Sequence, residues 1–240
     1  MSGQIKAFVF DVFGTVVDWR VGVARAFVAS GLIPGADAAM GLRFADAWRG
    51  RYVPAFMKVN RGERPFVKLD VLHMENLREI LPAFGVDPAG VAPELLERLN
   101  MAWRRLTPWP DSVEGLARLK TCYIIAPHSN GNLRLLLEMA KHGGLPWDAI
   151  LGAEVVGAYK PTPHSYLRTA ELLSLHPHEV CMTAAHNDDL QAARACGLRT
   201  AFIYRRMEYG PEQRTDLQPA ADWDFIAESI TDLAAQAGCA

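Results

Sequence analysis

The stretch Phe8-Val9-Phe10-Asp11-Val12-Phe13-Gly14-Thr15 decides the fold of this chain. Residues 5–10 form a short apolar run, which predicts a buried strand of a parallel sheet that ends at Asp11. The Gly14-Thr15 turn directs backbone N–H groups and the Thr15 hydroxyl toward one point, and such a point suits an anion. Taken alone, the pattern is equally consistent with a polar strand end that has no chemistry, so the downstream sequence has to decide.

Three further apolar runs predict strands of the same sheet, at residues 122–126, 180–183 and 200–204. Helical patterns, such as those at residues 133–142 and 190–196, separate these runs. Strands that alternate with helices are typical of an α/β fold with a doubly wound, Rossmann-like parallel sheet.

The pattern changes to helices alone between about residues 19 and 108. Helices are predicted at 36–58, 65–84 and 93–106, with breaks at Gly62, at the turn 85–88 and at Pro108. We therefore predict a core domain of residues 1–18 and 109–240. Residues 19–108 are predicted to form a helical cap, inserted after the first strand and lying over the carboxyl ends of the strands.

The composition limits which binding partners and which cellular location are expected for the chain. Of its 240 residues 50% are hydrophobic and 22% are charged, which predicts a packed core. The net charge of -2 and the absence of a recurring basic stripe argue against nucleic acid as a partner. No signal-like or membrane-length apolar run is present. The four cysteines lack a C-x-x-C pairing and favour reduced thiols in the cytoplasm.

Three more segments place polar side chains where a predicted strand meets a helix. They are residues 127–131 with Ser129 and Asn130, residues 159–161 with Lys160, and residues 184–189 with His186 and Asp189. Each has an ordinary interpretation, because Ser, Asn and Asp cap helices and a lone lysine is usually solvated. Successive strand ends that all carry polar groups are hard to explain as independent caps, since the carboxyl ends of parallel strands form a ligand crevice. The sequence therefore predicts one site.

These segments resemble the four ordered motifs of the haloacid dehalogenase superfamily. The family has an aspartate nucleophile with Gly-Thr, then a Ser or Thr, then a Lys, then an acidic segment. Here the matching residues are Asp11, Ser129, Lys160 and Asp189. The resemblance spans nearly the whole chain, and the helical insertion stands where the family has its cap.

Two positions distinguish the main activities of that superfamily. Its phosphatases carry a second Asp two residues after the nucleophile, as general acid for the leaving oxygen. Here that residue is Phe13, which cannot donate a proton, whereas a halide leaves without one. Phosphatases also hold Mg²⁺ with an acidic residue four positions before the last motif Asp, and here that position is Ala185.

In detail the chain resembles the type II 2-haloacid dehalogenases. The matching residues are Phe13, the pair Trp48-Arg49, Ser129-Asn130-Gly131, and Tyr159-Lys160-Pro161 followed by Tyr166. Those enzymes have serine and asparagine where this chain has Ala184 and His186, and tryptophan where it has Asp188. The sequence therefore leaves undecided how the fourth motif holds a water and which substrates the chain accepts.

The resemblance implies a two-step displacement on an (S)-2-haloalkanoate. Asp11 attacks C2 and forms an ester, while Arg49 and Asn130 receive the halide. The substrate carboxylate is expected on Ser129 and on the backbone N–H groups of Val12 and Phe13.

In the second step a water attacks the ester and releases an (R)-2-hydroxy acid. Asp189 is expected to position this water, with His186 as a further candidate. Lys160 keeps Asp11 ionised, Thr15 orients Asp11, and Tyr166 orients Lys160 or Asp189. The resemblance implies no metal ion, no cofactor, a small-molecule 2-haloacid substrate and a homodimer.

Five aromatic residues are candidates for an apolar wall that keeps water from the nucleophile, and we expect at least half of them to pack in the helix core instead. They are Phe13, Trp48, Tyr52, Phe56 and Phe66. Three other functions remain open from the residues. They are a Mg²⁺-dependent small-molecule phosphatase, a hydrolase that opens a strained ring or cleaves another carbon substituent, and a catalytically silent binding module.

Overall fold

The computed structural model describes residues 4–239, and within them a parallel sheet of six strands positions the candidate site. The strand order is β5-β4-β1-β6-β7-β8, so β1 (Ala7–Phe10) lies inside the sheet. Its neighbours are β4 (Ile124–Ser129) and β6 (Val180–Ala184). All four residues of β1 are buried, because helices cover both faces of the sheet at this strand. The outer strands are β5 (Leu151–Gly152), β7 (Arg199–Ile203) and β8 (Phe225–Ala227).

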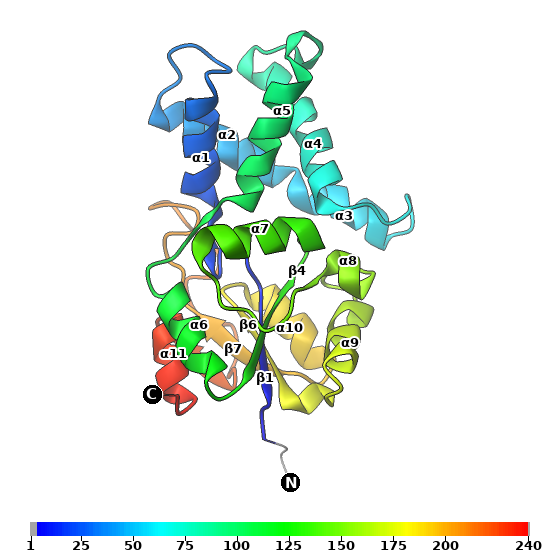
Figure 1. The fold of residues 1–240 in the computed structure, drawn as a ribbon, viewed down its shortest axis with the longest axis vertical. Coiled ribbons are helices and arrows are strands. Elements are labelled where there is room, and N and C mark those ends of the chain that lie inside the picture. Colours follow the sequence, from blue (N-terminus) through cyan, green and yellow to red (C-terminus); the bar gives the residue numbers. More distant parts are fainter. Residues whose placement is uncertain (1–3, 240) are drawn as a thin grey trace.

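Two hydrophobic clusters lie on opposite faces of this sheet. Phe8 and Phe10 pack into the cluster that contains residues of α6 (Ser112–Lys120), α7 (Leu133–Gly143) and α11 (Ile230–Gln236). Ala7 and Val9 pack into the other cluster, with α9 (Pro163–Leu172) and α10 (Asn187–Ala195). The alternation along β1 follows from the two-residue period of a strand. The doubly wound α/β sheet predicted from the sequence is confirmed (Figure 1).

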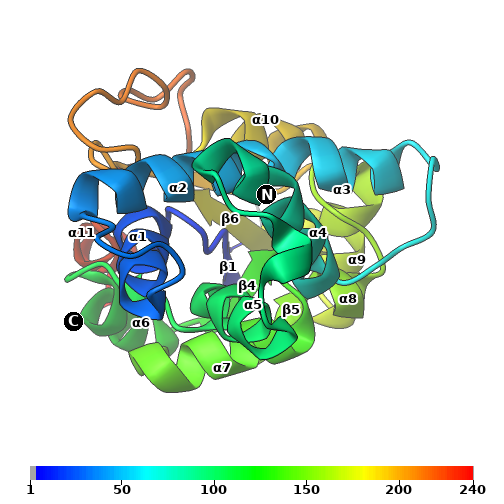
Figure 2. The same ribbon diagram turned by 90° about the horizontal axis from the view of Figure 1, so that it is seen from above.

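A segment made only of helices leaves the sheet after β1. It lies beyond the carboxyl ends of the strands, between β2 (Val17–Asp18) and β3 (Thr107–Pro108), which pair antiparallel (Figures 1 and 2). Its α-helices are α1 (Trp19–Ser30), α2 (Ala38–Gly50), α3 (Tyr52–Asn60), α4 (Leu69–Ile80) and α5 (Pro93–Asn100). The 3₁₀ turns of the segment are η1 (Leu81–Phe84), η2 (Pro88–Gly90) and η3 (Met101–Arg104).

The single helix predicted at residues 36–58 is wrong, because the chain forms α2 and α3 with a break at Arg51. Pro54 explains the break. Its missing N–H could not bond to the carbonyl four residues earlier in a continuous helix, whereas it is tolerated in the first turn of a new one. Helix α1 was not among the helices predicted. Asp18 starts it by accepting a hydrogen bond from the N–H of Val21 at 3.0 Å.

Two other predicted helices are shorter than expected. The helix predicted at 65–84 begins at Leu69 and gives way to the 3₁₀ turn η1, where Pro82 cannot supply an α-helical N–H. The helix predicted at 93–106 ends at Asn100 and tightens into η3, as last turns often do.

The strand predicted at residues 122–126 is shifted along the chain, since β4 runs from Ile124 to Ser129. Cys122 and Tyr123 donate to the carbonyl of Leu119 and so complete the end of α6 before the strand begins. Polar His128 stays within the strand because its Nδ1 lies 2.9 Å from the hydroxyl of Thr169 on α9. Strands β5 and β8 were not predicted. The remaining elements are the short helix α8 (Ala153–Val156) and the 3₁₀ turn η4 (Pro177–Glu179).

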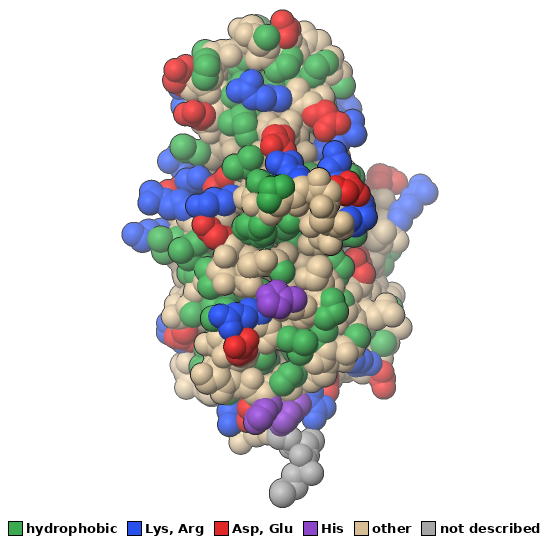
Figure 3. All heavy atoms as spheres, turned by 90° about the vertical axis from the view of Figure 1, so that its right-hand side faces the viewer, with side chains coloured by type: hydrophobic (Ala, Val, Ile, Leu, Met, Phe, Trp, Pro, Cys, Tyr) green, Lys and Arg blue, Asp and Glu red, His purple; other side chains and the backbone are tan. Residues whose placement is uncertain are grey.

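Basic and acidic side chains are interspersed over the face shown in Figure 3. Within residues 4–239, every helix is too short or too polar to cross a membrane.

Candidate active site

Asp11 lies directly after β1, where the sheet holds its backbone and leaves its side chain at the strand end. Its N–H donates to the carbonyl of Thr183 on β6 at 2.9 Å, and the residue is 7% exposed. The hydroxyl of Thr15 donates to Oδ2 of Asp11 at 2.9 Å and accepts from the N–H of Ala185 at the same distance. The turn that brings Thr15 back needs a left-handed residue, and Gly14 supplies it with φ of 92°. The first and last motifs are thus joined through Thr15.

Lys160 joins two carboxylates at the centre of the site. Its Nζ donates to Oδ1 of Asp11 at 2.9 Å and also donates to Oδ2 of Asp189. The hydroxyl of Tyr166 donates to the other oxygen of Asp189 at 2.6 Å. All four residues are buried, so their charges interact strongly.

Electrostatics keep Asp11 ionised despite its burial. Burial alone would raise the pKa of Asp11, but the ammonium of Lys160 and the hydrogen bond and charge of His186 hold that pKa well below its ordinary value. For Asp189 burial prevails and raises the pKa, although Lys160 opposes the shift. Of these two carboxylates, both of which line the cavity, Asp11 is therefore the one whose pKa favours the ionised form.

A cavity of about 610 Å³ lies between the strand ends and the helical segment. Asp11, Lys160, Asn130 and His186 line it from the sheet side, and Arg49 lines it from α2. Its other lining residues are Tyr52, Val53, Phe56, Pro161, Tyr166, Asn187, Asp188, Asp189, Gln191, Tyr209, Thr215 and Asp216.

Arg49 meets the cavity with part of its guanidinium unpaired. The guanidinium carbon lies 4.2 Å from the ring centre of Tyr52 and 5.3 Å from that of Trp19. Its Nη1 is buried and, within the described part of the chain, has no hydrogen-bond partner. A buried donor without an acceptor is costly, so this N–H group is one that an acceptor on a bound molecule would stabilise.

The structure brings most of the predicted site residues together, but not all of them line the cavity. Asn130 does so, and its Oδ1 accepts from the N–H of Lys160 at 2.8 Å. Ser129 is buried, accepts from the N–H of Gly131 at 3.2 Å, and is absent from the cavity lining. Val12 and Phe13 also lie behind the lining, so their expected contacts with the substrate carboxylate, like that of Ser129, stay predictions.

The five candidates for an apolar wall divide as follows. Tyr52 and Phe56 line the cavity. Phe13 and Trp48 are buried against Trp103, with ring centres 5.9 Å and 5.5 Å away, and so belong to the core behind the site. Phe66 is 36% exposed and stacks on Tyr159.

Comparison with known proteins places this site in a family. A family model described as haloacid dehalogenase-like hydrolase matches residues 5–197. The chain belongs to this family. The matched region includes the residues that surround Asp11, from Thr15 to Asp189.

Three similar haloacid dehalogenases extend the comparison. The (S)-2-haloacid dehalogenase 4A of Burkholderia cepacia is 28% identical over 242 residues, which cover 98% of this chain and 100% of that protein. The crystal structure of a defluorinating L-2-haloacid dehalogenase is 51% identical, with a TM-score of 0.95 and coverage of 98% of this chain and 96% of the other. A second L-2-haloacid dehalogenase structure is 45% identical, with a TM-score of 0.90 and coverage of 97% and 99%.

A magnesium ion, as used by the phosphatases of this haloacid dehalogenase-like family, does not fit the residues present. Both oxygens of Asp189 are engaged by Lys160 and Tyr166, and residue 185 is an alanine without a side-chain oxygen. Within residues 4–239, no group of three or more His, Cys, Asp and Glu side chains is arranged to hold a metal.

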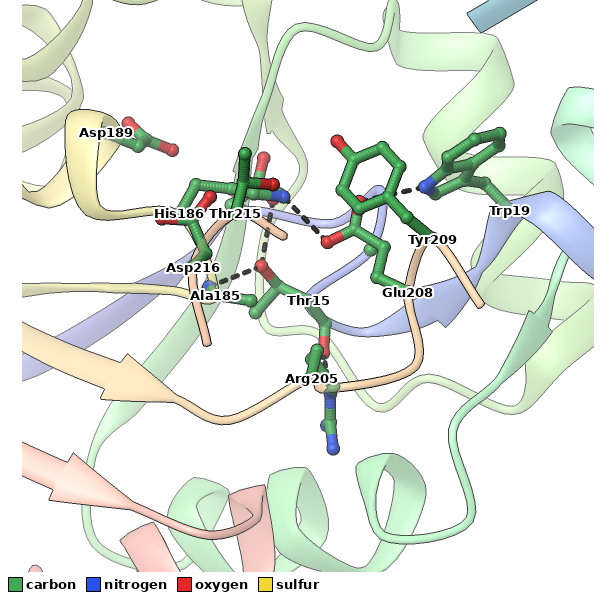
Figure 4. Close-up of polar contacts among 12 residues, drawn as sticks. Thr15, Trp19, Ala185, His186, Asp189, Arg205, Glu208, Tyr209, Thr215 and Asp216 are labelled. Atoms are coloured by element: carbon green, nitrogen blue, oxygen red, sulfur yellow. Dashed lines mark hydrogen bonds and ion pairs between the residues drawn. The ribbon is translucent and has the colours of Figure 1, made fainter. Parts of the chain in front are cut away.

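A fifth polar segment of this haloacid dehalogenase-like site, the loop that follows β7, was not predicted from the sequence. Arg205 anchors the loop, because its Nε donates to the carbonyl of Thr15 at 2.8 Å. Glu208 then contacts His186, and Tyr209 lines the cavity (Figure 4). The signal was present, since the charged run at 205–208 directly follows a buried apolar strand, as the other site segments do.

Proposed function

We propose that this chain hydrolyses (S)-2-haloalkanoic acids to (R)-2-hydroxy acids through an ester on Asp11. One observation carries the proposal. An ionised carboxylate faces a cavity that is also lined by Arg49, whose buried Nη1 has no hydrogen-bond partner among residues 4–239. That arrangement suits displacement of a leaving group that departs as an anion, without a proton donor at position 13. The haloacid dehalogenases described above support the substrate class.

In the first step Asp11 attacks C2 from the side opposite the halogen, which inverts that carbon. Arg49 and Asn130 receive the halide, and Ser129 with the N–H groups of Val12 and Phe13 holds the substrate carboxylate. Alignment supplies most of the rate, because the reacting atoms are held in line and no acid catalyst is needed.

In the second step a water positioned by Asp189 adds to Cγ of the Asp11 ester. Lys160 contacts both Asp11 and Asp189 and so is placed to pass a proton to the departing alkoxide oxygen, which becomes the hydroxyl group of the product. Tyr166 orients Asp189.

We also propose that residues 19–108 act as a cap domain over a core of residues 1–18 and 109–240. Arg49, Tyr52 and Phe56 of this segment line the same cavity as Asp11, so closure of the segment would complete the site. The family resemblance adds a homodimer, and the cysteine pattern adds a cytoplasmic location. Light scattering of the purified protein and cell fractionation would test these two proposals.

The test is halide release from (S)-2-chloropropionate in the presence of EDTA. We expect turnover by the wild type, none by Asp11→Asn, and a large loss in Arg49→Ala. Arg43→Ala, an exposed arginine on the same helix, is the matched control and should behave as wild type.

A single turnover in isotopically labelled water distinguishes the ester route from direct hydrolysis. The label should enter the carboxyl group of Asp11 and not the first molecule of product. Label in that first product, or a requirement for Mg²⁺, would contradict the proposal. Fluoroacetate should be tested as a second substrate in the halide-release assay, because one similar structure is that of a defluorinating enzyme.

A further inference from the structure

His186 lies between two carboxylates. Its Nδ1 is 3.3 Å from Oδ2 of Asp11, and its Nε2 is 2.9 Å from Oε2 of Glu208. An imidazole ring donates to two acceptors at once only in its protonated form. Burial alone would lower the pKa of His186, but the carboxylates of Glu208 and Asp11 raise that pKa well above its ordinary value. The two neighbouring carboxylates therefore favour the protonated form of His186.

The fold is built to hold Glu208 beside this ring. Glu208 is 2% exposed, and its second oxygen accepts from Nε1 of Trp19 at 2.9 Å (Figure 4). A Cβ at position 14 would lie 2.1 Å from that carboxylate, so the turn after the nucleophile admits Glu208 only because the residue is Gly14. A buried carboxylate needs such partners, because burying it unpaired carries the full desolvation penalty of an ion.

The two oxygens of Asp11 have different partners. Oδ2 accepts from Thr15 at 2.9 Å and faces His186 at 3.3 Å, whereas Oδ1 contacts Lys160 at 2.9 Å. With fewer donors, Oδ1 is the better nucleophile. Oδ2 then becomes the carbonyl oxygen of the ester, and it carries the negative charge when water adds to Cγ.

We propose that Glu208 is a positioning residue that keeps His186 protonated, so that the imidazolium and the Thr15 hydroxyl together stabilise the oxyanion on Oδ2 during ester hydrolysis. This inference rests on the proposed function and assigns His186 a role on the ester oxygen. Fixed donors aimed at a developing charge are among the strongest contributions to catalysis in buried sites.

The water oxygen bonds to Cγ, one water proton passes to Asp189, and the carbonyl electron pair moves onto Oδ2. On collapse the bond from Cγ to Oδ1 breaks, and Oδ1 leaves with the product and takes a proton from Lys160. Asp189 returns its proton to Lys160, and the new carboxylic acid of Asp11 loses its proton to solvent.

Glu208 matters most at the ester stage. Esterification removes the negative charge of Asp11, which lowers the pKa of His186, and Glu208 then supplies the carboxylate in contact with the ring. The other charged or titratable groups that line the cavity with this ring are Arg49, Tyr52, Lys160, Tyr166, Asp188, Asp189, Tyr209 and Asp216.

The experiment separates the two chemical steps in full-length protein. Rapid quenching measures halide released in the first turnover, and intact-protein mass spectrometry measures the ester. The variants are His186→Asn and Glu208→Gln, with Glu212→Gln on the same loop as exposed control. In His186→Asn the first-turnover halide should persist, while ester hydrolysis slows by roughly 10²–10³-fold and the ester accumulates.

The pH dependence of ester hydrolysis tests what the negative charge of Glu208 does. In wild type, hydrolysis should fall at alkaline pH as His186 loses its proton. In Glu208→Gln that limb should move to lower pH, because the ring has lost its carboxylate neighbour, and in His186→Asn it should vanish. Glu212→Gln should match wild type.

Absence of ester accumulation in His186→Asn, or an unmoved alkaline limb in folded Glu208→Gln, would overturn the inference. If Glu208→Gln does not fold, the ester level in His186→Asn decides alone. Failure of the wild type to release halide through Asp11 would instead contradict the proposed function.

Discussion

The guanidinium of Arg49 lies over the ring of Tyr52, with 4.2 Å between the guanidinium carbon and the ring centre. The two residues are close in sequence but belong to different helices, because the chain breaks at Arg51. The break lets both side chains line the cavity, and the ring holds the guanidinium in place.

Replacing this ring should weaken halide release. We expect Tyr52→Leu to lower kcat/KM by about 2- to 30-fold, which corresponds to roughly 0.5–2 kcal/mol for a cation–π contact. Tyr52→Phe keeps the ring face and should lose much less. Equal activity of the two variants in a halide-release assay would argue against a role of the ring in holding Arg49.

Removing the ammonium at the centre of the site should destabilise the protein. Lys160→Met leaves the buried carboxylates of Asp11 and Asp189 without their shared cation, which costs about 3–5 kcal/mol. Urea unfolding at neutral pH measures this loss, with Lys141→Met, an exposed lysine, as control.

The Lys160→Met variant should regain part of its lost stability at acidic pH. Without the ammonium the pKa of each carboxyl rises, so protonation neutralises them at a higher pH than in the wild type. A deficit that is constant from neutral to acidic pH would show that the two carboxylates are not the source of the destabilisation.

The hydroxyl of Tyr166 should set the acidic limb of the activity profile. Its hydrogen bond to Asp189 lowers the pKa of that carboxyl, against the effect of burial. Tyr166→Phe should therefore raise the pKa of Asp189 and move the acidic limb of kcat to higher pH. Tyr204→Phe removes a hydroxyl that bonds to Gln218 away from the site and should leave the profile as in wild type.

Trp48 should contribute to stability more than to chemistry. It is fully buried, and its Nε1 donates to the carbonyl of His73 at 2.9 Å. Trp48→Ala should cost about 3–5 kcal/mol in the free energy of unfolding, because it leaves a large cavity. Trp48→Phe loses mainly the hydrogen bond, about 1 kcal/mol, so comparable losses in both variants would contradict this explanation.

Much of the site could be predicted from the sequence because it obeys a local rule. Asp11 follows a buried strand, Lys160 precedes a helix and Asp189 lies in the first turn of one. Parallel strands bring such junctions to one edge of the sheet. Element ends were less predictable. Pro54 lies in the first turn of a new helix and does not merely kink the predicted one. The polar residues His128 and Ser129 remain inside β4.

The sequence by itself determined the alternation of strands and helices, the aspartate after the first strand, and the absence of an acid at position 13, because these depend on the residue types and on short-range periodicity. Only the tertiary structure decided that Glu208 stands between His186 and Trp19, the latter 189 positions away. No local pattern encodes such a contact. It exists because the loop after β7 folds back over the first turn, where Gly14 leaves room for a buried carboxylate.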